Sequence, residues 1–335
     1  MSSRGFRCRG ADRQAGVSLV ELMIGLGLGM VLVAALLLLF ANASSSGHNL
    51  ARAGAQIENG RYVSELLREE MQLAGFYGEM SVRGAVYSTP DPCSVVVIGW
   101  AAAPLTIPTP VTGYLGSDAL GCLADRKPGT QAIAVRRLGT VAVAPSTLDI
   151  ARAQYYVQYS FCTDDMPPLL RSGIDPVGFT LRNRGCAAVN TVRPYVSRIY
   201  YVASCRRCGS VPDTNPTLKR VDMVGDQLVT TSLADGIDDL RFEYGFDQDG
   251  NGSPDIWLAA PGAAGPTAGW SNVMAVKLYF ITRSLDKAEG RALAGAQTFQ
   301  LGGLGTVVTA DDGYTRSLFS TLVRLVNPSA ALEAQ

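Results

Sequence analysis

The pattern of apolar and polar positions divides the chain into an apolar segment, an amphipathic stretch and a body of short alternating runs. Residues 22–41 carry no charged side chain, and about 20 apolar residues are enough for a helix to cross a bilayer. From Leu50 to Ala74, apolar or small residues recur mostly three and four positions apart, which is the period of an amphipathic helix. We therefore expect one long helix at residues 17–75 that starts in a membrane, at about 22–41, and ends against a packed body.

The body, from residue 79 onward, contains short runs rich in β-branched and aromatic residues, separated by Pro, Gly, Asn and Asp. Such runs predict β-strands. They lie at residues 94–100, 131–138, 154–161, 195–203, 218–224, 227–231, 237–246, 272–283 and 314–326. In the run 237–246, apolar Leu240, Phe242 and Tyr244 alternate with Arg241 and Glu243, as expected of a half-buried antiparallel strand.

The expected fold class is therefore α+β, with a long amino-terminal membrane-spanning helix followed by a mostly antiparallel β head. The head has two expected parts, an irregular region with cysteines at residues 79–210 and a carboxyl-terminal region with an acidic loop at residues 218–328. Residues 211–216, which contain two prolines and an asparagine, are the expected linker or hairpin between them.

Composition removes several classes of function. Lys and Arg number 29 and Asp and Glu also number 29, so the chain lacks the positive field on which nucleic-acid binders depend. The chain has a single histidine, His48, which argues against a histidine-containing catalytic triad and against a histidine-rich metal site. The sequence also has no Gly-Lys phosphate loop and no Gly-x-Ser-x-Gly elbow. We expect neither an enzyme nor contact with nucleic acid.

The residues before the apolar segment indicate its orientation. They carry four arginines against one aspartate, and the positive-inside bias keeps such an end in the cytoplasm and exports the body. A cleaved secretory signal would use the small residues Ala41 and Ala43, but its apolar region is usually only about 7 to 15 residues long. An uncleaved membrane anchor is the second interpretation, and the third depends on residues 16–24.

Residues 16–24 (GVSLVELMI) resemble the processing site of type IV prepilins. In that family a basic leader ends in Gly, and the mature chain starts with an apolar residue and has Glu at its fifth position. The resemblance implies a leader at residues 1–16, cleavage after Gly16, and amino-terminal methylation at Val17, where Phe is more frequent. It also implies that Glu21 pairs with the amino terminus of a neighbouring subunit. An unpaired Glu costs several kcal/mol in hydrocarbon, whereas the alternative is a Glu21 solvated among lipid headgroups.

Further segments resemble PilW-like minor pilins: residues 58–78, residues 235–245 with the acidic loop that follows, and the closing run 316–328. The resemblance implies a minor pilin that acts in the initiation of type IV pilus assembly or at the pilus tip. It implies as partners other minor pilins, the major pilin, the prepilin peptidase and methylase, and the inner-membrane assembly platform. It places the chain in the inner membrane with a periplasmic body, and then in the pilus at the cell surface. A type II secretion pseudopilin and a membrane-tethered exported binding or enzymatic domain are the alternatives.

An acidic run, Asp247–Asp255 (DQDGNGSPD), matches the first nine positions of a calcium-binding loop. The expected ligands are the side chains of Asp247, Asp249 and Asn251, the carbonyl of Ser253, and Asp255 directly or through water. Position twelve is Leu258 instead of Glu, and flanking strands exclude an EF-hand. Calcium is the expected cofactor, and an ion-free turn is the alternative.

Removal of the leader with Cys8 leaves six of the seven cysteines, and an even number in an exported body predicts disulfides. Pairing of neighbours closes the shortest loops. It joins Cys93 to Cys122, Cys162 to Cys186, and Cys205 to Cys208. The last pair has the spacing of a redox motif and of half a zinc site. The Gly and Pro that follow it favour a structural disulfide in a tight loop instead.

Overall fold

The computed structural model describes residues 16, 18–96, 100, 104–151, 153–163, 165, 168–261, 269–287 and 295–333, without the side chains of residues 45, 48 and 49. The chain forms two compact units, Met1–Arg52 and Ala53–Gln335. Helix α1 (Leu19–Leu73) contributes residues to both. Each unit is described by itself.

In the first unit, α1 is apolar and exposed. The segment Leu19–Ser44 has a mean hydropathy of 2.8 and is long and apolar enough to cross a membrane. Glu21 lies in its first turn, where a negative charge interacts favourably with the helix dipole.

In the second unit, one face of α1 packs into the main core. Val63, Leu67, Met71 and Ala74 are almost completely buried there, at intervals of four, four and three residues, as an amphipathic helix requires. The helix ends before Gly75, which adopts a φ of 69° and donates its N–H to the Arg136 carbonyl at 3.0 Å. Glycine takes this left-handed conformation without strain, and it commonly terminates helices.

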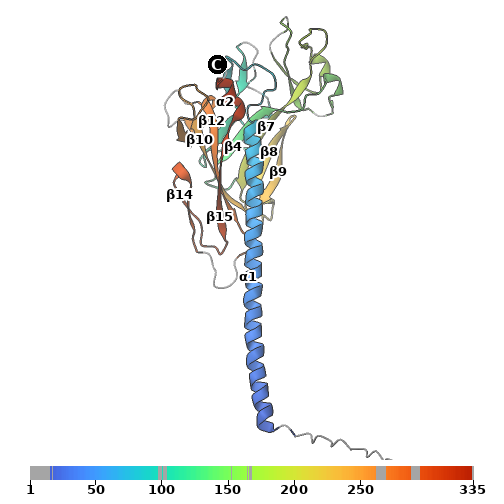
Figure 1. The fold of residues 1–335 in the computed structure, drawn as a ribbon. Helices are drawn as coiled ribbons and strands as arrows, with labels where there is room; N and C mark the ends of the chain where they lie inside the picture. The colour runs from blue at the N-terminus through green and yellow to red at the C-terminus, as the bar shows by residue number, and fades with distance from the viewer. Residues whose placement is uncertain are drawn as a thin grey trace, which may run out of the picture. The chain divides into compact units, whose positions relative to one another are not determined.

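Two antiparallel sheets form most of this unit (Figure 1). The first sheet contains β3 (Val111–Tyr114), β4 (Ala132–Leu138), β7 (Val192–Ala203), β5 (Tyr155–Gln158) and β6 (Leu169–Ser172) in that order, with β8 (Thr217–Val224) on β7 and β9 (Gln227–Asp235) on β8. The second has the order β11 (Ile256–Leu258), β10 (Ile237–Phe246), β12 (Val273–Arg283), β15 (Arg316–Arg324). Residues 211–216 thus connect two neighbouring strands of one sheet.

Smaller elements complete the described part of the chain. They are the parallel pair β1 (Val86–Ser88) and β2 (Thr106–Pro108), the hairpin β13 (Thr298–Gln300) and β14 (Thr306–Val308), the helix α2 (Val326–Glu333), and the 3-10 turns Pro145–Thr147, Pro176–Gly178, Trp270–Asn272 and Gly302–Leu304. The expected α+β class is confirmed. The strand expected at 94–100 is wrong for residues 94–96, where the Ser94 hydroxyl bonds the backbone of Val96 and competes with strand pairing. Residues 97–99 lie outside the described residues.

The main core lies where α1 and the two sheets meet. The alternating residues of β10 point into it, and Leu240, Phe242 and Tyr244 are at most 1% exposed. The opposite face of β10 is less exposed than the alternation predicts, because Glu243 is also buried. Its carboxylate accepts hydrogen bonds from the Tyr279 hydroxyl at 2.7 Å and the Gly303 N–H at 3.0 Å. Burial and this carboxylate raise the pKa of Tyr279 to about 12.

Candidate functional site: the amino terminus, the stem contact and the acidic loop

The predicted processing site lies at the edge of the described chain. Gly16 is exposed, and no heavy atom would lie within 4 Å of a Cβ added to it. The first helical bond of α1 runs from the Leu22 N–H to the Ser18 carbonyl at 3.1 Å, so Gly16 precedes the helix. An exposed, non-helical peptide is the kind that a peptidase can bind. Residues 1–15 and Val17 lie outside the described residues.

Glu21 is exposed at the start of the apolar segment. In a bilayer its carboxylate requires a partner, or it must lie near the headgroups.

A buried ion cluster fixes α1 to the first sheet, and sequence reasoning missed it. Glu70 of α1 accepts hydrogen bonds from Arg137 of β4, at 3.4 Å, and from Arg198 of β7. The three side chains are 13%, 10% and 21% exposed. Arg198 also pairs with Asp222 of β8 at 2.8 Å. In the amphipathic stretch at residues 50–74, Glu70 is one of the polar positions, which indicate solvent. The two adjacent arginines in the run 131–138 were the signal that could have predicted the cluster.

Electrostatics in this cluster follow from its burial. Burial lowers the pKa of Arg198, but the carboxylates of Glu70 and Asp222 raise it, with a net increase. Burial, and next the Glu70 carboxylate, raise the pKa of Tyr200. The Glu70 carboxylate thus holds the carboxyl-terminal part of α1 against cationic side chains of the sheet.

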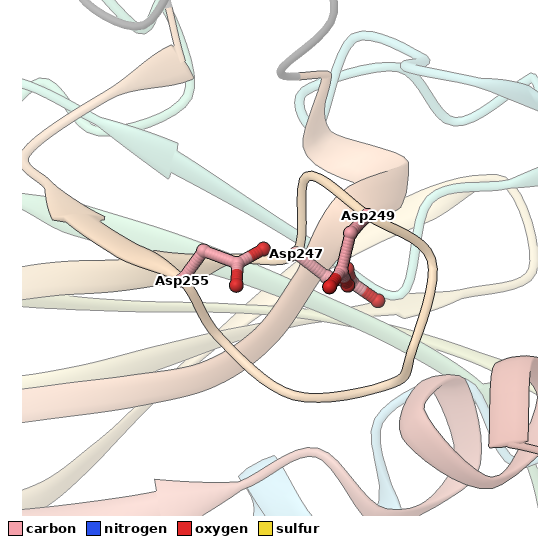
Figure 2. A group of neighbouring side chains, drawn as sticks. All are labelled: Asp247, Asp249 and Asp255. Carbon is pink, nitrogen blue, oxygen red and sulfur yellow. The ribbon is translucent and has the colours of Figure 1, made fainter.

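The acidic loop connects β10 to β11 and brings three of its predicted ligands together. One carboxylate oxygen from each of Asp247, Asp249 and Asp255 lies within 4.8 Å of the other two (Figure 2). Asp247 is buried, and the other two are exposed. Asp255 is the last residue of the loop and directs its carboxylate toward the other two from the opposite side (Figure 2).

Hydrogen bonds within the loop hold these carboxylates in place. The two oxygens of Asp247 accept the N–H groups of Gly250 and Gly252, each at 2.7 Å. Asp255 accepts the Gln248 N–H at 2.7 Å. Gly252 adopts a φ of 81°, and a Cβ on it would lie 2.8 Å from the Ser329 carbonyl oxygen. The loop therefore packs closely against α2.

Of the other predicted ligands, Asn251 contacts one of the three carboxylates. The Asn251 amide oxygen accepts the Ser253 N–H at 2.7 Å, and its amide nitrogen donates to Asp249 at 2.9 Å. Ser253 is exposed, and Leu258 pairs with Tyr244 in the sheet. Each of the three carboxylates has lone pairs that its hydrogen bonds within the loop do not use. Such oxygen atoms are the ligands that a hard cation prefers. The bidentate ligand of a complete calcium loop does not come from position twelve.

We expect calcium to bind this loop weakly. Calorimetric titration of the full chain in detergent micelles should give heat with an affinity of roughly micromolar to millimolar. Asp249→Asn should abolish that heat, whereas Asp226→Asn, an exposed acid in the β8–β9 turn, should leave it unchanged. A titration without heat over this range would show that the loop is an ion-free turn.

Three disulfides join the six body cysteines. They are Cys93–Cys122, Cys162–Cys186 and Cys205–Cys208, with Cα–Cα distances of 5.4, 5.2 and 5.3 Å. This is the pairing of neighbours that the sequence order predicts. The first two disulfides join turns and loops that lie between the strands of residues 79–210, and the third closes a loop just after β7.

Two family models match the chain. The model of type IV pilus-assembly protein W matches residues 199–327, and the model of the prokaryotic N-terminal methylation motif matches residues 12–37. The first match runs from β7 to the start of α2 and includes the acidic loop, and the second includes Gly16 and Glu21. No curated protein and no solved structure matches the chain. The two matches confirm the similarity to PilW-like type IV minor pilins.

Proposed function

Because the chain is similar to PilW-like type IV minor pilins, we propose that it is a minor pilin that acts in the initiation of pilus assembly or at the pilus tip. The observation that carries the proposal is the combination, at one end of the chain, of a methylation motif and a membrane-length apolar helix. The match of the body to a pilus-assembly protein supports it independently. The same match favours a pilus over a type II secretion pseudopilus.

The proposed mechanism is assembly and involves no catalysis. The leader is removed after Gly16, the apolar part of α1 is stored in the inner membrane, and it then packs among the helices of other subunits. Glu21 pairs with the amino terminus of a neighbour, which removes the cost of an isolated charge in hydrocarbon. The prepilin peptidase and methylase, the assembly platform, the other minor pilins and the major pilin are the proposed partners.

The size of the body supports a position at the tip. The chain continues for 260 residues beyond Gly75, and the second compact unit contains all of them. A body of this bulk would crowd a shaft of small repeating subunits. At a tip, it has neighbours on one side only.

Processing is the first expected result. Intact-mass measurement of the protein extracted from membranes should show loss of residues 1–16, with a methyl group on Val17. Gly16→Leu should keep the full-length mass, because a leucine side chain would lie directly beside the peptide bond that is to be cleaved, where glycine has none. A wild-type chain of full length, or one that begins after Ala43, would contradict the proposal.

The role in assembly is tested in the same strains. A strain without this chain should show fewer surface pili and less twitching, and the wild-type chain should restore both. The Gly16→Leu chain should not restore them, although it reaches the membrane. Normal piliation in the deletion strain would count against a role in initiation.

A further inference from the structure

An open polar cavity on the first sheet is lined by one cysteine of the Cys205–Cys208 disulfide. Tyr200 and Val202 of β7 point into the main core with α1, whereas Tyr201 belongs to a separate cluster, so the cavity lies on the sheet face that points away from α1. Its volume is about 460 Å³. The lining side chains include Cys122, Asp125, Tyr201, Arg206, Cys208 and Lys219.

A buried lysine lies against Cys208. The Nζ atom of Lys219 is 3.5 Å from the Cys208 Sγ and 2.7 Å from an Asp125 carboxylate oxygen. Lys219 is only 5% exposed, so water screens its charge poorly, and Asp125 is its paired carboxylate. Among the residues that the structure describes, no lysine or arginine hydrogen-bonds a sulfur of the other two disulfides. A thiolate at Cys208 would therefore face a fixed positive charge, the arrangement that makes cysteines reactive.

The two sulfurs of this disulfide differ in access. Cys208 is half-buried and lines the cavity, whereas Cys205 is 6% exposed and does not line it. The cysteines are three residues apart, against 29 and 24 for the other pairs. Since a short closed loop constrains the unfolded chain least, this disulfide contributes least to stability. It is the pair that the fold can open at the lowest cost.

We propose that Cys205–Cys208 is a thiol–disulfide exchange site, at which a dithiol of the exported compartment reacts with Cys208. A thiolate of the partner attacks the Cys208 Sγ, the Cys205–Cys208 bond breaks, and its electron pair leaves on Cys205, which takes up a proton. The second thiol of the partner then attacks the partner sulfur of the mixed disulfide and releases Cys208 as a thiolate beside Lys219. Two electrons pass to the protein, and the partner becomes a disulfide.

The surroundings keep the opening local. The Asp213 carboxylate accepts hydrogen bonds from the backbone N–H groups of Arg206 and Arg207, each at 2.9 Å. These two bonds hold the pKa of Asp213 below its usual range, and the bond from Arg207 has the larger effect. The two residues between the cysteines therefore stay fixed when the disulfide opens. The ionisable groups around Cys208 are Lys219, Asp125, Tyr201 and Arg206, and Arg206 pairs with Asp235 at 3.0 Å.

Differential alkylation tests the proposal on the full chain in detergent micelles. The protein is equilibrated with dithiothreitol and its oxidised form at a series of ratios, and trapped thiols are identified by peptide mass. Cys205 and Cys208 should be trapped at ratios at least about tenfold less reducing than the four cysteines of the other two disulfides. Reduction of the three disulfides together, or of this one last, would overturn the proposal.

Single-cysteine variants identify the reacting sulfur. Cys205→Ser leaves Cys208 free, and oxidised glutathione should modify it at least about tenfold faster than it modifies Cys205 in Cys208→Ser, because only Cys208 is accessible and faces a cation. Equal rates would overturn the assignment. Glutathione also reports whether a small thiol can enter the cavity, since a monothiol leaves a mixed disulfide that accumulates, whereas the second thiol of dithiothreitol resolves it.

Lys219→Met tests the role of the lysine, which is a positioning residue: its positive charge is held beside the Cys208 sulfur and stabilises the thiolate. The alkylation rate of reduced Cys208 at pH 7 should fall about tenfold, and its pH profile should move to higher pH. Lys127→Met is the matched control, since Lys127 also pairs with an aspartate, Asp238, but hydrogen-bonds no described sulfur. Asp125 keeps its bond from Tyr201 at 2.8 Å, and tryptophan fluorescence verifies that both variants are folded. An unchanged profile in the folded Lys219 variant would overturn the role. These outcomes do not depend on processing or piliation.

Discussion

Glu70→Ala is expected to lower the free energy of unfolding of the body by about 3 kcal/mol, because it leaves two buried arginines without their shared carboxylate. Arg137 loses its acidic partner and keeps the Leu138 carbonyl as acceptor at 3.2 Å. Arg198 retains Asp222, which places the loss at the lower end of the range for a broken buried pair. Denaturation of the full chain in detergent, followed by tryptophan fluorescence, measures the change. All three tryptophans, Trp100, Trp257 and Trp270, belong to the body.

The adjacent residue provides the matched control. Glu69 is exposed on the same helix, and Glu69→Ala should change the free energy of unfolding by no more than about 0.5 kcal/mol. Glu70→Met combined with Arg137→Met should recover part of the loss, because replacing both partners of a buried pair costs less than removing one. If Glu70→Ala matched Glu69→Ala, the cluster would contribute nothing to the attachment of α1 to the sheet.

The long elements could be predicted from the sequence because their periodicity extends over many residues. The apolar segment and the amphipathic stretch predicted a helix at 17–75, and the structure has one at Leu19–Leu73. The same holds for β10, in which the alternating apolar residues from Leu240 to Phe246 all belong to the core. In these elements local propensity and burial favour the same structure.

The burial of two acidic residues could not be predicted from the sequence, because it depends on contacts with residues far away along the chain. Glu70 and Glu243 occupy positions where a polar residue indicates solvent, yet both are buried. Glu70 is neutralised by arginines 67 and 128 positions away, and Glu243 accepts a hydrogen bond from a tyrosine 36 positions away. The spacing of hydrophobic residues along the chain does not reveal which distant residue a buried carboxylate will contact. In the acidic loop, by contrast, the spacing alone predicted the three carboxylates that the fold brings together.

The second large effect is expected at Gly60, which lies on the buried face of α1. A Cβ on this residue would lie 2.5 Å from the Cε1 of Phe319 in β15. The Phe319 ring cannot retreat freely, since it stacks on Phe280 with ring centres 5.3 Å apart and planes inclined by 9°. Glycine costs a helix interior about 1 kcal/mol relative to alanine, so close packing is the physical reason for a glycine here. Gly60→Leu should destabilise the body by about 2 to 3 kcal/mol through overpacking.

The same substitution six residues earlier should have the opposite sign. Gly54 lies in α1 with no atom within 4 Å of an added Cβ, so Gly54→Leu should stabilise the helix by up to about 1 kcal/mol. Denaturation followed by tryptophan fluorescence compares the two variants. Phe319→Ala should be less harmful in the Gly60→Leu chain than in the wild type, because the smaller residue makes room for the leucine, and a coupling of at least about 1 kcal/mol is expected. Equal effects of the two glycine substitutions would mean that β15 does not pack on α1 at this position.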